Sequence, residues 1–260
     1  MDIQREAAAT CPPFVVRLTF HGDLSVFLKR SGRVQPVERH LKERTSIKDI
    51  IESCGVPHPE VDIIRGQNEE IEFSCVIDKN MNIDVYPVNF IHLQAPRRHL
   101  QIREVSHFVA DVHLGGLTRN LRLLGIDVAA PAMADDRQLL EIMQKEDRAL
   151  LTRDRRLLMH SIVQTGFHPH SQVPDEQTIE VLRRFNLASY LAPFTRCLHC
   201  NALLQPAAKA EVIDCLEPLT RKYYEEFRRC QGCDRIYWRG SHFDKLLRRV
   251  EEFRSKIAIM

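Results

Sequence analysis

The first ordered part of the chain is marked by alternation of apolar and polar positions, after an N-terminal tail, residues 1–13, that we expect to be frayed. In FVVRLTF, Phe14 to Phe20, every second side chain is apolar, as in a half-buried strand. Ser46 to Asp49 predicts a capping box that opens a helix through Ser53, with Gly55 as its stop. Further short extended segments are predicted at residues 24–29, 34–39, 61–64, 71–77 and 83–88.

A second pattern, in which strands alternate with helices, begins near residue 106. Short apolar strands are predicted at residues 107–110, 126–130 and 148–152. Leucines at helical spacing follow the first strand, and Gly125 closes that helix. Further helices are predicted after Asp136, around Leu157 to Val163, and at 175–185. This alternation is typical of an α/β domain with a parallel sheet.

The patterns divide the chain into a β-rich module, a linker, an α/β domain and a small cysteine-bearing segment, at residues 14–90, 91–105, 106–190 and 195–245. The order hairpin, helix, strands in the first module is that of the β-grasp fold, an α+β fold. Its segment NMNIDVYPV resembles the closing strand of ubiquitin-like sulfur carriers. Those carriers end in an activated Gly-Gly, which is absent here, so we expect a binding or scaffolding role with a protein partner. Sulfur transfer or conjugation is the alternative.

Composition places the chain among ordinary globular proteins, with 260 residues, 44% hydrophobic and 28% charged. No apolar run approaches the roughly 18 residues of a membrane span, and the N-terminus lacks a signal-peptide core. We therefore expect a cytoplasmic protein with no membrane partner. Net charge is +2, but residues 196–260 carry 13 Lys and Arg against 9 Asp and Glu. That surplus suits either a docked polyanion or an ordinary solvated surface.

Four of the eight cysteines form two CxxC pairs, Cys197 with Cys200 and Cys230 with Cys233, separated by 29 residues. Four thiolates match the tetrahedral preference of Zn²⁺, so the spacing predicts a structural zinc ribbon. The insert between the pairs, 207–227, is expected to be partly helical, and His199 is not expected to be a ligand. The other four cysteines are expected to be plain thiols: Cys11, Cys54, Cys75 and Cys215.

Acidic residues stand where the predicted parallel strands end. Asp111 directly follows HFVA, and Asp154 follows ALLTR. Asp136 is expected to cap the intervening helix, near the same sheet edge, with Asp135 as an alternative. Carboxylates that meet repel one another unless a cation such as Mg²⁺ or Mn²⁺ lies between them. Each aspartate also has the simpler interpretation of a helix cap.

Other polar residues near these acids are candidates for contact with a phosphate backbone. Arginine pairs well with phosphate, so one or two of Arg119, Arg122, Arg153 and Arg155 are predicted to hold such a backbone, with surface charge as the alternative for each. Trp238 and Arg239, after the second cysteine pair, are predicted to stack on bases, or to form the core and rim of the ribbon with Tyr237 and His242. Thr152 is expected to hydrogen-bond a carboxylate or to suit a strand. His113 is expected to be an ordinary helix-start residue, with proton transfer as the alternative, and Glu141 is expected on a solvated helix face, with support of a metal ligand as the alternative.

The segments FVADVHLGGLTRNLRLLGID and DDRQLLEIMQKEDRALLTRD resemble the Mut-seven C-terminal ribonuclease family, a PIN-like group. The CxxC pairs, the run IYWRGSHF and the β-grasp module resemble the rest of that family, so the resemblance covers about residues 14–245. It implies divalent-metal-dependent cleavage of RNA, with Asp111, Asp136 and Asp154 as ligands. The alternative is a non-catalytic RNA-binding adaptor that has lost its metal.

Overall fold

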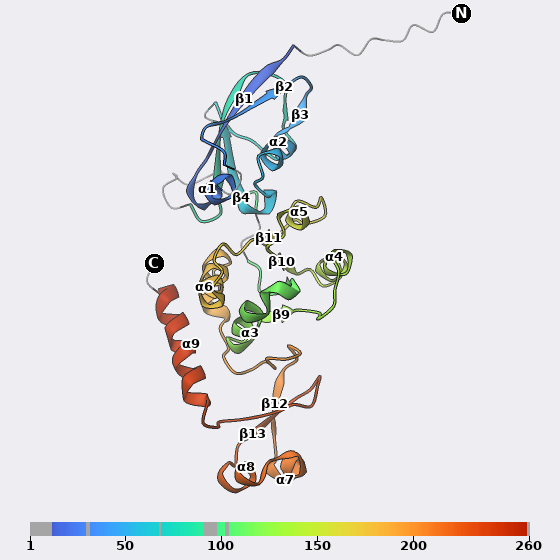
Figure 1. Cartoon of the computed structure of the whole chain (residues 1–260), viewed down its shortest axis with the longest axis vertical. Helices are drawn as coiled ribbons and strands as arrows, with labels where there is room; N and C mark the ends of the chain where they lie inside the picture. Colours follow the sequence, from blue (N-terminus) through green and yellow to red (C-terminus); the bar gives the residue numbers. More distant parts are fainter. Residues whose placement is uncertain (1–11, 30–31, 68, 91–97, 102–103, 259–260) are drawn as a thin grey trace, which may run out of the picture. The chain divides into compact units, whose positions relative to one another are not determined.

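The computed structural model describes residues 12–29, 32–67, 69–90, 98–101 and 104–258. Contacts divide the chain into two compact units: residues 1–102 with 155–164, and residues 103–154 with 165–260. Figure 1 shows the elements of both units along the sequence. Cys11, the tail before residue 12 and most of the predicted linker lie outside the described residues. No helix in the described ranges combines the length and apolar character needed to cross a membrane.

The first unit is built on a five-stranded sheet in the order β2-β1-β7-β4-β5. Its two central strands, β1 and β7, are parallel, and the other pairings are antiparallel. A separate two-stranded sheet joins β3 to β6. The bounds are β1 (Phe14–Phe20), β2 (Val37–Leu41), β3 (Thr45–Ser46), β4 (Val61–Gly66), β5 (Glu69–Glu70), β6 (Val76–Ile77) and β7 (Met81–Pro87).

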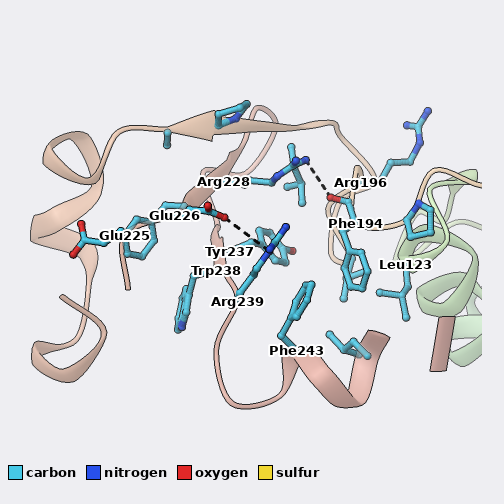
Figure 2. A pocket seen from close by; sticks show the side chains of 17 residues that line it. Leu123, Phe194, Arg196, Glu225, Glu226, Arg228, Tyr237, Trp238, Arg239 and Phe243 are labelled. Carbon is cyan, nitrogen blue, oxygen red and sulfur yellow. Dashed lines mark hydrogen bonds and ion pairs between the residues drawn. The ribbon is translucent and has the colours of Figure 1, made fainter. Parts of the chain in front are cut away.

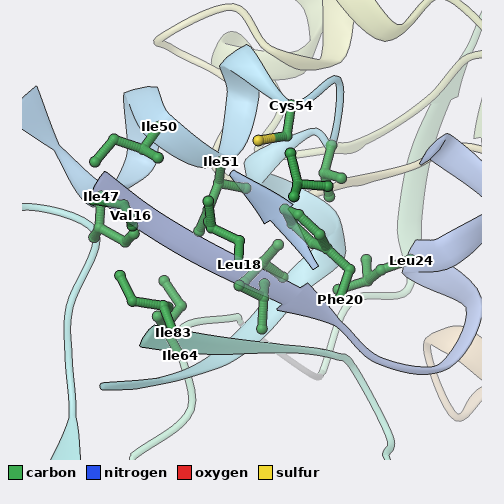
Figure 3. Packing of buried hydrophobic residues seen from close by; sticks show 14 of the residues in the cluster. Val16, Leu18, Phe20, Leu24, Ile47, Ile50, Ile51, Cys54, Ile64 and Ile83 are labelled. Carbon is green, nitrogen blue, oxygen red and sulfur yellow. The ribbon is translucent and has the colours of Figure 1, made fainter. Parts of the chain in front are cut away.

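One helix, α2 (Ile47–Ser53), covers this sheet and confirms the β-grasp prediction. The Ser46 hydroxyl accepts a hydrogen bond from the Asp49 amide at 3.1 Å, which caps the helix as the sequence predicts. Ile47, Ile50 and Ile51 point into the core, where they meet the alternate side chains of β1 (Figure 3). The period-two pattern of β1 therefore builds one face of this core.

Three predicted extended segments take other forms. Residues 24–29 are helical, in η1 (Gly22–Leu24) and α1 (Ser25–Lys29), because Leu24, Phe27 and Leu28 bury one face at helical spacing. The second segment shifts to residues 37–41, where it pairs with β1. In the third, residues 71–77, only Val76–Ile77 form a strand, β6, which pairs with β3 outside the main sheet.

The second unit contains a four-stranded sheet in the order β11-β10-β8-β9, and all its pairings are parallel. The α/β prediction is therefore confirmed. The short strand β11, at the sheet edge, was not expected. The bounds are β8 (His107–Ala110), β9 (Asp127–Ala129), β10 (Ala149–Leu151) and β11 (Gly166–Phe167), with η3 (Val112–Leu114), α3 (Gly115–Leu123), α4 (Asp136–Lys145), α6 (Pro174–Arg184) and η4 (Leu187–Tyr190).

The cysteine-bearing segment forms a small antiparallel sheet in the order β12-β13-β14. Its insert is partly helical, as predicted. The last helix, α9, was missed from the sequence although Val250 and Phe253 are buried in the α/β core, where α9 packs against α6 (Figure 1). The bounds are β12 (Leu204–Ala207), α7 (Lys209–Val212), η5 (Ile213–Cys215), α8 (Pro218–Tyr223), β13 (Phe227–Cys230), β14 (Ile236–Trp238) and α9 (Phe243–Ala258).

A short excursion from the α/β domain, residues 155–164, belongs to the first unit by its contacts. It contains α5 (Arg155–Leu158), which is shorter than the predicted helix around Leu157 to Val163. In that unit, the His58 ring Nε2 lies 2.6 Å from the Val163 carbonyl oxygen, and η2 (His58–Glu60) carries this histidine.

Substitution of Gly125 tests the close chain approach at the end of α3. This glycine has φ of +86°, and a Cβ there would lie 2.0 Å from the Ala192 carbonyl oxygen. We expect Gly125→Ala to lower the free energy of unfolding by about 2 kcal/mol or more. The single tryptophan, Trp238, lies in the second unit, so denaturation followed by its fluorescence measures this unit.

Gly115→Ala is the matched control, since a Cβ at this helical position has nothing within 4 Å. It is expected to be neutral or to stabilise the unit by roughly 0.5 kcal/mol. Equal midpoints for the Gly125 variant and the wild type would contradict the clash.

Candidate active site and zinc site

The four paired cysteines come together in the ribbon, and their sulfur atoms all lie within 4.8 Å of one another. The Sγ atoms of Cys197 and Cys233 are 3.6 Å apart, and those of Cys200 and Cys230 are 3.3 Å apart. A tetrahedral zinc with Zn–S bonds of about 2.3 Å places its sulfurs roughly 3.8 Å apart. The cluster therefore fits a closed tetrahedral metal site.

Backbone and neighbouring groups prepare these sulfurs for a metal. The amides of Cys200 and Gly232 point at Cys197 Sγ and Cys230 Sγ, at 3.5 and 3.4 Å. Burial opposes ionisation of Cys197, but hydrogen bonds from the Tyr237 hydroxyl and the Cys200 amide outweigh it and lower the pKa of this thiol to about 6. Burial instead raises the pKa of Cys200 to about 12, and the pKa of Cys233 is also raised. Because zinc binds thiolates, Cys197 is ready to bind a metal, whereas Cys200 and Cys233 would lose their protons on binding.

The first cysteine knuckle is attached to the α/β sheet through the carboxylate of Asp127, in β9. This carboxylate accepts hydrogen bonds from Arg148 at 2.6 Å and Asn201 at 2.8 Å, and Arg196 lies 3.1 Å away. Burial alone would raise the pKa of Asp127, but hydrogen bonds from Arg148 and Asn201 and the charge of Arg196 hold it below its ordinary value. Asn201 and Arg196 flank the first CxxC pair, so the sheet and the knuckle share one ionic network.

Arg122, one of the predicted RNA contacts, is buried and takes a structural position instead. Its guanidinium donates two hydrogen bonds to the Val128 carbonyl, at 3.0 and 2.8 Å, and one to the His199 carbonyl at 2.7 Å. Burial is the main reason that its pKa lies below the ordinary value for arginine. The side chain thus joins α3, β9 and the first knuckle, and its donors are occupied.

Two of the predicted acids stand at the carboxyl edge of the parallel sheet and are connected through Thr152. Asp111 follows β8, and Asp154 lies three residues after the neighbouring strand, β10. The buried Thr152 hydroxyl donates to Asp111 Oδ2 at 3.0 Å and accepts a hydrogen bond from the Asp154 amide at 3.0 Å. Asp111 also caps η3 by accepting from the His113 amide at 3.2 Å. Asp111 is therefore a helix cap, and this position is also compatible with its predicted role as a metal ligand.

The third acid is placed one residue differently from the expectation. Asp135, not Asp136, is the N-cap of α4, and it forms a capping box with Gln138. Asp136 is the first helical residue, and its side chain is exposed. The helix starts from the loop that leaves the carboxyl end of β9, on the edge where Asp111 stands.

Among the described residues, the cysteines are the only group of three or more potential ligands whose ligand atoms all lie within 4.8 Å of one another. The three aspartates share a sheet edge but do not converge that tightly, which departs from the sequence-based expectation. Mg²⁺ is commonly held by one or two carboxylates, with retained waters and substrate phosphates completing the shell. The oxygen donors present at this edge fit that open type of site.

A cavity of about 550 Å³ lies beside Asp111 and extends to the first cysteine knuckle. Arg119, predicted to contact RNA, lines it and is exposed. Arg153 donates to the Gln172 side chain. Arg155 belongs to the first unit, where its guanidinium lies 3.5 Å from the Phe27 carbonyl oxygen. Glu141 accepts from Arg137 on an exposed helix face, as expected of a surface residue.

Trp238 and Arg239 line a different cavity, of about 570 Å³, between the ribbon sheet and the start of α9 (Figure 2). The Arg239 guanidinium lies 5.3 Å from the centre of the Phe243 ring and 3.9 Å from Glu226. Trp238 is 41% exposed, so its ring is half available to a ligand. The core and stacking interpretations of these two residues are both compatible with this position.

The fold and the site define a class: a PIN-like α/β domain with acids at the carboxyl edge of its sheet and a four-cysteine ribbon joined to it. The chain belongs to the Mut7-C RNAse domain family, whose sequence model matches residues 106–250. The model of the Mut7-C ubiquitin domain matches residues 14–92. No curated protein and no solved structure matches the chain.

Sequence reasoning missed Asp127, Asn201 and Arg235, which the structure places around the first knuckle and its cavity. Asp127 reads as an ordinary polar residue in a three-residue strand, and its partners are distant in sequence. For Arg235, proximity to the second CxxC pair was the available signal. The missed helix α9 had a clearer signal, since Leu246, Val250, Phe253 and Ile257 repeat at helical spacing.

The ionic network at Asp127 predicts a pH-dependent contribution to stability. Because its folded pKa lies below the ordinary 3.8, the contribution is complete above that pH and is lost as the pH falls through the folded value. We expect Asp127→Asn to lower the free energy of unfolding by about 1–3 kcal/mol at pH 7. The difference from wild type, measured by Trp238 fluorescence, should shrink below about pH 4.

Asp234→Asn is the control, because this carboxylate pairs with Arg229 on the ribbon surface and is 75% exposed. Its effect should not exceed about 0.5 kcal/mol. A difference for the Asp127 variant that stays constant down to pH 3 would show that the buried charge contributes nothing.

Proposed function

We propose that the protein is a divalent-metal-dependent ribonuclease that hydrolyses RNA phosphodiester bonds at the carboxyl edge of its parallel sheet. The observation that carries the proposal is that one buried hydroxyl, that of Thr152, donates to the Asp111 carboxylate and accepts from the backbone amide of Asp154. The family to which residues 106–250 belong supports the same activity. Asp111, Asp136 and Asp154 are the proposed ligands of Mg²⁺ or Mn²⁺.

In this proposal, the residues of the chain hold and orient, and the cation supplies activation of water and stabilisation of charge on the phosphodiester. The Thr152 hydroxyl donates a hydrogen bond to Asp111 Oδ2 and the His113 amide donates one to Asp111 Oδ1, so the chain orients both oxygens of this proposed ligand. Asp136 is exposed at the first turn of α4, where retained waters can connect it to the cation. Arg119 adds positive charge beside Asp111 for the RNA backbone.

The cysteine cluster is proposed to hold a structural Zn²⁺, since four thiolates leave no open position for a substrate. The ubiquitin-like module is proposed to bind a protein partner. It has a well-packed β-grasp core, and the Gly-Gly that carrier chemistry needs does not follow its closing strand, so binding is the role that remains.

Replacement of Asp111 by asparagine tests the catalytic proposal. Asparagine keeps an oxygen for the His113 amide, and its NH2 group can donate to the Thr152 hydroxyl, which also accepts hydrogen bonds, so the fold should persist. Loss of a metal ligand should cost more than the roughly 10- to 100-fold typical of outer-shell partners, so we expect cleavage to fall by at least about 100-fold. Cleavage of a mixed RNA pool with Mn²⁺ or Mg²⁺ measures the effect.

Asp135→Asn is the matched control, because asparagine is an equally good helix cap and Asp135 is already occupied by its capping box. It should keep most of the activity, whereas Asp136→Asn should lose it. Equal cleavage by wild type and the Asp111 variant would remove Asp111 from the mechanism. RNA binding by the wild type without cleavage in either metal would support the adaptor alternative.

The zinc proposal predicts one zinc per chain, lost in Cys230→Ser. Cys215→Ser is its control, since Cys215 is exposed and lies outside the cluster. Elemental analysis of purified protein gives the metal content, and Trp238 fluorescence should report a lower unfolding midpoint for the Cys230 variant alone. Full zinc content in the Cys230 variant would contradict the four-cysteine site.

A further inference from the structure

The cavity beside Asp111 has two walls that come from different parts of the second unit. Asp111 and Arg119 lie on the wall formed by η3 and α3. His199, inside the first knuckle, and Arg235, just after the second CxxC pair, lie on the wall formed by the ribbon. The ribbon is therefore part of the same recess that contains the proposed catalytic acid.

The charges that line this recess favour an anion. Three arginines and one histidine face a single acid, Asp111. The arginines differ in their availability: Arg122 is buried, with its donors on backbone carbonyls. Arg119 and Arg235 are exposed, and within the described part of the chain neither guanidinium makes a hydrogen bond or an ion pair. Two uncommitted guanidiniums on opposite walls suit the phosphates of an extended strand.

We propose that Arg119 and Arg235 bind the phosphate backbone of single-stranded RNA from opposite walls of this recess, so that the zinc ribbon forms half of the substrate cleft. The inference rests on the proposed ribonuclease function and specifies where its substrate lies. It gives Arg235, and the ribbon that carries it, a role in substrate positioning beyond a structural staple.

Hydrogen bonds hold the two walls of the recess together, so Arg119 and Arg235 are placed for RNA binding before the RNA arrives. Arg122 connects α3 to the His199 carbonyl at 2.7 Å. Asn201 accepts from the Val128 amide at 3.1 Å and donates to Asp127 at 2.8 Å. Because the knuckle is tied to the sheet, the wall carrying Arg235 does not have to be ordered when RNA binds. Preorganised phosphate contacts also place the strand against Asp111.

Equilibrium binding of a fluorescent single-stranded RNA, measured between 50 and 200 mM salt, tests the inference. All variants are made in the Asp111→Asn background, so that the RNA is not cleaved. We expect Arg235→Ala and Arg119→Ala each to weaken binding by about 3- to 10-fold and to reduce the salt slope by about 0.7. Arg235→Lys keeps the positive charge and should retain most of the slope.

Arg229→Ala is the matched control, an arginine on the same ribbon that is paired with Asp234 outside the recess. It should leave affinity and slope unchanged. Zinc content and the unfolding midpoint must match among the variants, which separates lost contacts from a damaged ribbon. In the cleaving protein, Arg235→Ala should raise KM with little change in kcat.

The outcomes separate this inference from the ribonuclease proposal. Unchanged affinity and salt slope in Arg235→Ala would overturn the inference even if the wild type cleaves RNA. Binding that depends on Arg119 and Arg235 in a protein whose wild type cleaves nothing would uphold the cleft and reject the catalytic proposal.

Discussion

The carboxylate of Asp127 is the point on which the second unit depends. This carboxylate is partly buried. It contacts Arg148 from the sheet, and Asn201 and Arg196 from the cysteine-bearing segment. Departure of the knuckle would remove Asn201 and Arg196 and leave the carboxylate paired with Arg148 alone, so the network favours the attached knuckle. The ribbon is thereby part of the folded α/β domain, and not an appendage on a flexible connection.

This attachment explains why the chain returns to the α/β domain after the ribbon. Helix α9 starts beyond β14 and buries Val250 and Phe253 in the same core as Phe108 and Phe185. The ribbon is therefore held at both of its ends, by the ionic network before β12 and by the apolar face of α9 after β14. A structural metal bound by the four cysteines would stabilise the geometry of the whole recess, since one wall of the recess is the knuckle itself.

Apolar patterns gave most of the fold prediction, because β1, α2 and α3 each bury one face and the short apolar run of β8 is buried on both faces. They failed where short elements take their state from distant partners. Most of the segment 71–77 is not a strand, and its last two residues form β6 only because they pair with β3, a partner that lies far away in the sequence. Residues 155–164 follow the α/β pattern in sequence but belong by contacts to the first unit. Neither outcome is encoded in the local pattern of apolar residues.

The candidate site was predictable to the extent that chemistry follows from position in a parallel sheet. Strand ends identified Asp111 and Asp154, and the CxxC spacing identified the cysteines. Arginines could not be sorted in this way, because a guanidinium serves equally to bind a phosphate or to satisfy buried carbonyls. Arg119 and Arg122 are about one helical turn apart in sequence. In the structure, Arg119 is exposed in the recess, whereas the Arg122 guanidinium donates its hydrogen bonds to the carbonyls of Val128 and His199.

That difference between two neighbouring arginines has a physical basis in the sheet. Leu117 and Leu121 lie in the buried face of α3, and Arg122 reaches β9, the edge strand of the sheet, where its guanidinium donates to the Val128 carbonyl. Arg119 is exposed and lines the recess that also contains Asp111. The packing of α3 therefore places Arg122 in a structural position and leaves Arg119 accessible to an anion. A nuclease cleft needs both kinds, since the free guanidinium is useful only if the opposite wall is held in place.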